Sequence, residues 1–132
     1  MIGIDTSVLV RYFAQDDAIQ FAVARRLLQR ELSQDAPGHV SLVALAEMAW
    51  VLRSRYQSTR DELVTIVETL LCAPNIRVQD QDAVWLALDD CERAGVGVAD
   101  ALIAAVDQHH GCSHTATFDQ RATRIPGMKL LS

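Results

Sequence analysis

The segment Met1-Ile2-Gly3-Ile4-Asp5-Thr6-Ser7 opens the chain and carries the pattern on which the fold prediction depends. The run up to Asp5 is typical of a short buried strand, and Asp5 ends it. Thr6 or Ser7 then stands where a helix N-cap is expected. A strand followed directly by a helix is the first half of a βαβ unit, so the segment predicts the start of a parallel sheet.

The rest of the chain continues this alternation. Further short strands are expected at residues 39–41, 76–78, 114–118 and 129–131. Helices are expected at residues 8–13, 16–32, 41–56, 60–72, 80–95 and 98–110, with a short helical turn at 120–124. Thr59 and Glu62 have the spacing of a capping box at the start of one of these helices. Strands that alternate with helices predict an α/β fold in which a central parallel sheet carries helices on both faces.

Four acids lie within or beside apolar stretches. They are Asp5, Glu47, Asp100 and Asp119. A carboxylate in an apolar environment is destabilising unless a partner compensates its charge. A hard divalent cation takes oxygen ligands and can compensate several carboxylates at once. The four acids therefore predict a metal site.

The expected positions of these acids support a common site. Asp5 ends the first strand and Asp119 follows the fourth, and open parallel sheets bind ligands at the carboxyl ends of their strands. Asp100 lies in the first turn of its helix and Glu47 lies about two turns into its own, so both can project toward that edge. A metal ion there activates water for in-line attack on a phosphodiester. Each acid alone also fits a cap, turn or surface position, and Asp107 fits a solvent-facing or pairing position better than a site role.

Composition sets limits on function. The chain has 132 residues, half of them hydrophobic, and we expect one domain, residues 1–132, with its own core. The net charge of −5 argues against a passive nucleic-acid binder, but two divalent ions would add +4 and bring it to −1. Lys129 is the only lysine, so nearly all positive charge is arginine. Arg25, Arg26 and Arg30 form either a solvated helix face or a phosphate contact.

The cysteines and apolar runs predict a cytoplasmic protein. Cys72, Cys91 and Cys112 have no zinc-binding spacing and are expected to be free thiols in a reducing compartment. No apolar run approaches the length of a membrane span, and no signal-peptide pattern opens the chain.

Four motifs in the same order resemble the PIN domain family, and specifically its VapC-type toxins. They are Ile4-Asp5-Thr6-Ser7, the stretch SLVALAEMAWVL at residues 41–52, GVADALIAA at residues 97–105, and Thr117-Phe118-Asp119. Each motif alone is weak, but their order and spacing cover essentially the whole chain. The resemblance implies a three-layer α/β/α sandwich with a central parallel sheet. It also implies a Mg²⁺- or Mn²⁺-dependent endoribonuclease that cleaves cellular RNA.

The resemblance also implies roles for individual residues. Asp5 and Asp100 correspond to the principal metal ligands, and Glu47 and Asp119 complete the acidic pocket. Thr6 and Thr117 are expected to supply hydroxyl groups behind these ligands.

The resemblance further implies protein partners, namely a second copy of the chain and a cognate antitoxin. The helices expected at residues 42–56 and 60–72 are rich in Leu, Val, Ala and Trp. Because exposed apolar patches mark interfaces, we expect the antitoxin to lie in a groove between these helices. An arginine of the antitoxin is expected to reach toward Asp5, Glu47 and Asp100.

Two other classes of protein fit part of the pattern. One is a catalytically silent interaction module with a PIN-like fold, which a metal titration distinguishes from a nuclease. The other is a different α/β enzyme that handles phosphate. A receiver domain needs a lysine after its last strand, whereas Lys129 precedes Leu130. A phosphatase with a D-x-D nucleophile needs an acid where Ser7 stands.

Overall fold

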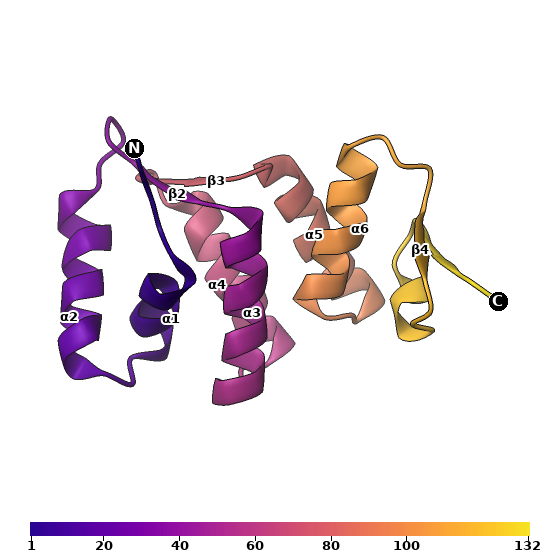
Figure 1. Cartoon of the computed structure of the whole chain (residues 1–132), viewed down its shortest axis with the longest axis horizontal. Helices are drawn as coiled ribbons and strands as arrows, with labels where there is room; N and C mark the ends of the chain where they lie inside the picture. The colour runs from indigo at the N-terminus through magenta and orange to yellow at the C-terminus, as the bar shows by residue number, and fades with distance from the viewer. The chain divides into compact units, whose positions relative to one another are not determined.

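The structure, a computed structural model, describes all 132 residues. Contacts along the chain divide it into two compact units, Met1–Gln79 and Asp80–Ser132. Each unit has its own helices and its own small parallel sheet (Figure 1). We describe the two units in turn.

The first unit alternates strands and helices around a three-stranded sheet. Its elements are β1 (Ile2–Gly3), α1 (Thr6–Ala14), α2 (Ala18–Arg26) with a π-helical turn (Leu27–Glu31), β2 (Gly38–Val40), α3 (Leu42–Tyr56), α4 (Arg60–Cys72) and β3 (Ile76–Val78). The strand order is β1-β2-β3, and both pairs of strands are parallel. A Cβ atom at Gly38 would lie 2.8 Å from the side chain of Leu32 and 3.0 Å from that of Ile4, so a larger residue at the start of β2 would displace these side chains.

Side-chain caps start the helices of the first unit. Ser41 accepts a hydrogen bond from the backbone N–H of Ala44 at the start of α3. Thr59 and Glu62 form the predicted capping box at the start of α4, which satisfies two backbone N–H groups. Asp5 caps α1, which corrects the expectation that Thr6 or Ser7 does so. The side chain of Asp5 accepts a hydrogen bond from the backbone N–H of Ser7, as N-cap aspartates commonly do.

The core of the first unit lies between its helices and the sheet. Its fully buried large side chains come from α1, β2, α3 and α4, and they are Leu9, Val40, Leu45, Met48, Leu52, Leu63 and Val67. The three strands differ in exposure, since Val40 on the central strand β2 and Val78 on β3 are buried while Ile2 on β1 is half exposed. Burial of alternate side chains on β2 and β3 shows that one face of the sheet packs on the helices.

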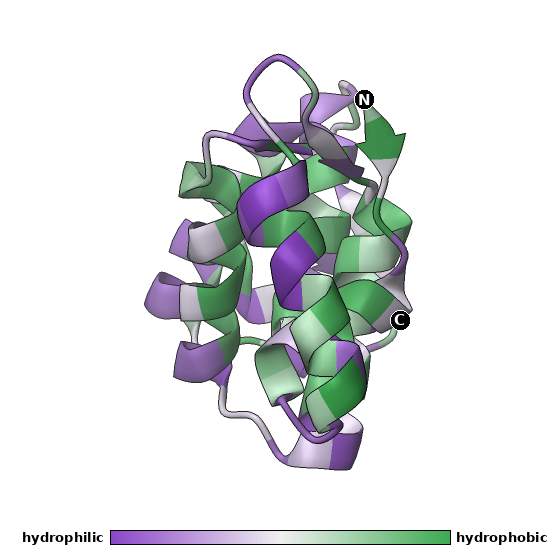
Figure 2. Cartoon of the chain, turned by 90° about the vertical axis from the view of Figure 1, so that its left-hand side faces the viewer, coloured by the Kyte–Doolittle hydropathy of each residue, from purple (hydrophilic) through white to green (hydrophobic).

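The helix predicted at residues 16–32 changes its geometry in its last turn. Its α-helical part ends at Arg26, and a π-helical turn follows from Leu27 to Glu31. Figure 2 shows α2 nearest the viewer, with mainly hydrophobic colours in its lower turns and hydrophilic ones in its upper turns. Over five residues, hydrophobic periodicity in the sequence cannot distinguish a π-helical turn from an α-helical one.

The second unit contains a helix pair and a two-stranded sheet. Its elements are α5 (Gln81–Ala94), α6 (Val98–His109), β4 (Thr115–Thr117), a 3₁₀ turn (Arg121–Arg124) and β5 (Met128–Leu130). Gly95 ends α5 in the left-handed conformation with φ of 67°, which glycine adopts without strain. The facing sides of α5 and α6 bury small side chains that allow close approach, namely Ala83, Ala87, Ala101 and Ala105.

These elements confirm the predicted α/β class with its six helices and parallel strands. The hydrogen bonds divide the five strands into sheets of three and two strands, where the sequence predicted one central sheet. Each strand has only two or three residues, and strand partners are set by tertiary packing that short sequence patterns do not encode.

No helix in the structure combines the length and the hydropathy that crossing a membrane requires.

Candidate active site

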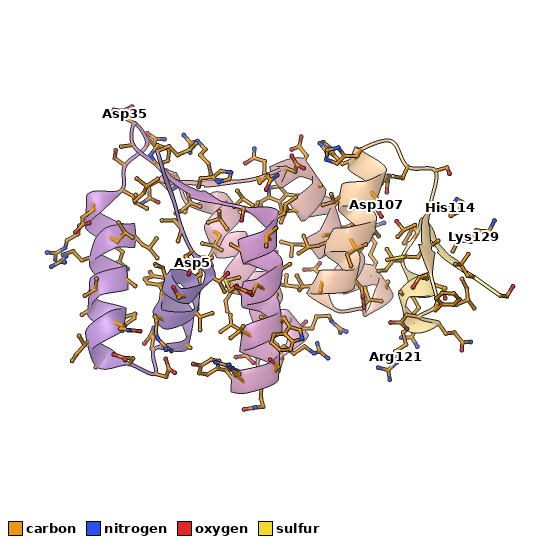
Figure 3. All side chains as sticks on the ribbon, in the orientation of Figure 1. Asp5, Asp35, Asp107, His114, Arg121 and Lys129 are labelled. Carbon is orange, nitrogen blue, oxygen red and sulfur yellow. The ribbon has the colours of Figure 1, made fainter.

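Asp5 lies at the junction between β1 and α1, directly after the buried side chain of Ile4 (Figure 3). Its Oδ2 atom accepts hydrogen bonds from the hydroxyl group of Ser7 at 2.7 Å and from the backbone N–H of Ser7 at 3.3 Å. These bonds, led by the one from the Ser7 hydroxyl, hold the pKa of Asp5 below its usual value. Asp5 is therefore a carboxylate at neutral pH, as a metal ligand must be.

Thr6 connects this junction to α3. The residue is buried, and its hydroxyl group donates a hydrogen bond to the backbone carbonyl of Ala44 at 3.5 Å. Glu47 follows Ala44 by three residues, so it lies on the same side of α3 about one turn later. The first unit thus places Asp5 and Glu47 on two helices that pack together, α1 and α3. The hydroxyl of Thr6 contributes by fixing one helix against the other.

Glu47 is exposed and makes no hydrogen bond or ion pair with the protein. It lies between Val43 and Trp50 on one stripe of α3, at spacings of four and three residues. Both neighbours are largely exposed, Val43 at 79% and Trp50 at 64%. The carboxylate oxygens of Glu47 are therefore free to bind a ligand.

Asp100 lies in the first turn of α6, two residues after Val98 begins that helix. Its side chain is half-buried and makes no hydrogen bond or ion pair with the protein. An acid in the first turn of a helix is a common arrangement, because the N-terminal end of a helix attracts negative charge. Asp100 is thus available as an oxygen ligand in the second unit.

Asp119 follows β4 in an exposed turn. Its Oδ1 atom accepts a hydrogen bond from the backbone N–H of Arg121 at 2.9 Å, and its own N–H donates to the Thr117 hydroxyl at 3.0 Å. Phe118 between them is 83% exposed. Local hydrogen bonds therefore hold Asp119, and the Thr117 hydroxyl shapes the turn that presents it.

Hydrogen bonds of Asp107 and Ser7 bear on the sequence predictions for this site. Asp107 accepts a hydrogen bond from the Thr115 hydroxyl at 2.8 Å, which joins α6 to β4 and confirms its predicted pairing role. The sequence interpretation missed the hydrogen bond from Ser7 to Asp5. The signal was present in the D-x-S spacing, because an aspartate commonly bonds to groups two residues later.

The four acids suit a divalent cation chemically. All are carboxylates, none is fully buried, and Glu47 and Asp100 have no protein partner. The structure contains no group of three or more His, Cys, Asp or Glu side chains that could hold a metal ion. The donor chemistry therefore fits Mg²⁺ or Mn²⁺, and metal binding by these four residues stays a prediction.

The apolar groove expected between α3 and α4 stays a prediction. Val43 and Trp50 expose apolar surface on α3, but α4 has no large exposed apolar side chain because its apolar positions belong to the core. An apolar hollow of about 320 Å³ lies instead on α1 and α2, lined by Ser7, Val8, Arg11, Ile19, Gln20, Val23, Ala24 and Leu27. Its lining includes Ser7, the hydrogen-bond partner of Asp5.

Comparison with known protein families gives one match. The PIN domain profile matches residues 2–128, which is nearly the whole chain and includes all four acids. No curated protein matches the chain. The observed α/β architecture agrees with this match, and PIN domains are generally nucleases that use divalent metal ions. The chain therefore belongs to the PIN domain family.

Proposed function

We propose that this PIN domain is an endoribonuclease that depends on Mg²⁺ or Mn²⁺. The observation that carries the proposal is the position of Asp5, which lies two residues after β1, caps α1 and accepts two hydrogen bonds from Ser7. The family match over residues 2–128 and the unpartnered carboxylates of Glu47 and Asp100 support it.

In the proposed mechanism, Asp5 and Asp100 are the principal metal ligands, and Glu47 and Asp119 complete the acidic set. When bound, a divalent ion lowers the pKa of a coordinated water and stabilises the departing oxygen of the phosphodiester. The residues of the chain itself position these ligands. Two hydrogen bonds from Ser7 orient the carboxylate of Asp5, and the bond from the backbone N–H of Arg121 holds the side chain of Asp119 in its turn.

Cleavage of a labelled RNA by the purified chain tests the proposal. We expect cleavage in Mn²⁺ or Mg²⁺, none in excess chelator, and strong loss in Asp5→Asn. The Asn side chain keeps the N-cap acceptor, so the variant is expected to stay folded. Equal cleavage in chelator, or near wild-type cleavage by folded Asp5→Asn, contradicts the proposal. No cleavage under any condition favours the silent interaction module.

We also propose that the chain acts as the toxin of a toxin–antitoxin pair and forms a homodimer. The exposed side chains Val43 and Trp50 on α3 and the apolar hollow on α1 and α2 support a protein partner. An antitoxin segment would place apolar side chains in that hollow and a basic side chain toward Asp5. Co-expression with an adjacent small open reading frame tests this role, and association that leaves RNA cleavage unchanged contradicts it.

A further inference from the structure

The π-helical turn at the end of α2 rearranges the charged residues there. Its backbone bond joins the N–H of Leu32 to the carbonyl of Leu27 at 3.1 Å, a spacing of five residues. In an α-helix, residues five apart are separated by about 140° around the axis. The wider π turn brings them closer to one face, and the Arg26–Glu31 ion pair at 3.1 Å has this spacing.

Arg25 and Arg30 have the same spacing of five residues. Both line a hollow of about 340 Å³ on the surface of α2 and the π turn, with Arg26, Gln29, Phe21 and Ala22. Phe21 is half-buried and gives the hollow an aromatic wall, whereas the three arginines are exposed. The hollow therefore combines cationic groups with one apolar ring.

Hydrogen bonds orient part of this hollow. The side-chain amide of Gln29 donates to the Tyr12 hydroxyl at 2.9 Å and accepts from Nε of Arg25 at 3.2 Å. The ring of Tyr12 in turn contacts the ring of Phe21, with centroids 6.0 Å apart. The terminal nitrogens of Arg25 make no hydrogen bond with the protein and remain available to a ligand.

The positive charge in the hollow is largely uncompensated. Only Arg26 has an acidic partner, Glu31, while Arg25 and Arg30 have none. Most Lys and Arg residues of the chain likewise lack an acidic partner, since only Arg11, Arg26 and Arg93 among them form ion pairs, but Arg25 and Arg30 line one hollow. Two unpaired guanidinium groups in one hollow form an anion-binding surface, because arginine forks match phosphate oxygens.

We propose that this hollow binds the backbone of single-stranded RNA, with Arg25 and Arg30 on phosphate oxygens and Phe21 against a base or ribose. The proposal rests on the proposed ribonuclease function, for which it supplies a substrate-binding surface besides the acids. Single-stranded RNA fits better than an acidic protein segment, because a base can stack on the ring of Phe21 while Arg25 and Arg30 contact the phosphates. The acidic chain needs such a local cationic surface to hold a polyanion.

Fluorescence anisotropy of a labelled single-stranded RNA, measured in excess chelator with the full chain, tests the proposal. The R25Q/R30Q variant is compared with R53Q/R55Q, which makes the same charge change on exposed arginines of α3. We expect about tenfold weaker binding for R25Q/R30Q and less than about a twofold change for the control. The slope of log K against log salt should fall by about 1.4, which is two phosphate contacts at 0.7 each.

The Glu31→Gln variant is expected to change RNA affinity in the opposite direction, toward tighter binding. It removes the carboxylate that pairs with Arg26, so RNA binding should become several-fold tighter. If R25Q/R30Q loses helical circular dichroism, R30Q alone keeps the test valid because the Arg25–Gln29 bond stays intact. Equal weakening by both double variants overturns the proposal, since that outcome reflects net charge alone.

Three further outcomes separate this proposal from related ones. If poly-L-glutamate competes as well as unlabelled RNA, the hollow takes acidic peptides and the RNA assignment is overturned. If the chain cleaves RNA in Mn²⁺ while R25Q/R30Q binds RNA like the wild type, this proposal fails and the nuclease function stands. If binding depends on Arg25 and Arg30 but no metal supports cleavage, this surface stands and the nuclease function fails.

Discussion

The two compact units hold their acidic residues in different ways. In the first unit, β2 and β3 bury alternate side chains against the helices, and Asp5 follows the buried Ile4. In the second unit, β4 and β5 have no buried residue, and Asp119 follows the exposed Phe118. A packed core therefore positions Asp5, whereas local hydrogen bonds alone position Asp119. This difference predicts unequal responses to mutation, beginning with the core.

The largest expected effect concerns a buried side chain of the first unit, compared with an exposed one of the second unit. Leu45→Ala removes a fully buried side chain of α3 and should cost about 2–5 kcal/mol in the free energy of unfolding. Leu130→Ala removes a side chain of β5 that is 41% exposed and should cost less than about 1 kcal/mol. Urea unfolding followed by circular dichroism measures both. Equal losses would show that β5 packs as tightly as α3.

The next effect concerns catalysis. Asp5→Asn keeps the helix cap but weakens a proposed metal ligand, so the rate of RNA cleavage should fall about a hundredfold or more, equivalent to about 2.7 kcal/mol. Asp119→Asn should have a smaller effect because its position depends only on a local turn. Single-turnover cleavage assays at saturating Mn²⁺ compare the two. A larger loss in Asp119→Asn reverses the ranking of the acids.

A smaller effect on stability is expected at Asp90 in the second unit. Asp90 is only 8% exposed, and burial, with a contribution from the neighbouring Asp89, raises its pKa. Because the folded-state pKa is raised, the ionised form opposes folding, and stability falls as the pH rises above the unfolded pKa. Asp90→Asn should therefore raise the melting temperature at pH 7 by about 2–5 °C and by less at pH 4. A lower melting temperature at pH 7 would show a stabilising role for the carboxylate.

The smallest effect has the opposite dependence on pH and lies in the first unit. The hydroxyl of Tyr56, followed by the charge of Arg11, holds the pKa of Asp16 below its usual value. A lowered folded-state pKa contributes stability above the unfolded pKa, and this is lost as the pH falls through the folded pKa. Tyr56→Phe should slightly lower stability at pH 7 and should have a smaller effect at pH 2. A constant difference across this range would assign the effect to packing.

Local signals explain which elements the sequence predicts well. The capping box of Thr59 and Glu62 sets the start of α4, and the observed bounds Arg60–Cys72 agree with the predicted ones. All five strands lie where short apolar runs predict them. Caps and periodicity act within a few residues, so they can be recognised without the fold.

Features that depend on tertiary packing, or on which of several neighbouring residues takes a role, were not predicted. Asp5, Thr6 and Ser7 all suit an N-cap, and only the structure shows that Asp5 accepts the bonds. The π turn at Leu27–Glu31 and the division of the strands into two sheets have no local signature. The candidate acids were identified by chemistry, and their joint binding of a metal stays a prediction because no three-ligand group is present.

Metal-dependent thermal unfolding tests the central claim most directly. Mn²⁺ at about a hundred times its dissociation constant should stabilise the wild type by about 2.7 kcal/mol, seen as a raised melting temperature. Asp5→Asn and Asp100→Asn should lose most of this rise, whereas Asp35→Asn, at an exposed loop acid (Figure 3), should keep it. An equal rise in all four proteins, or no rise in the wild type, contradicts metal binding by the proposed acids.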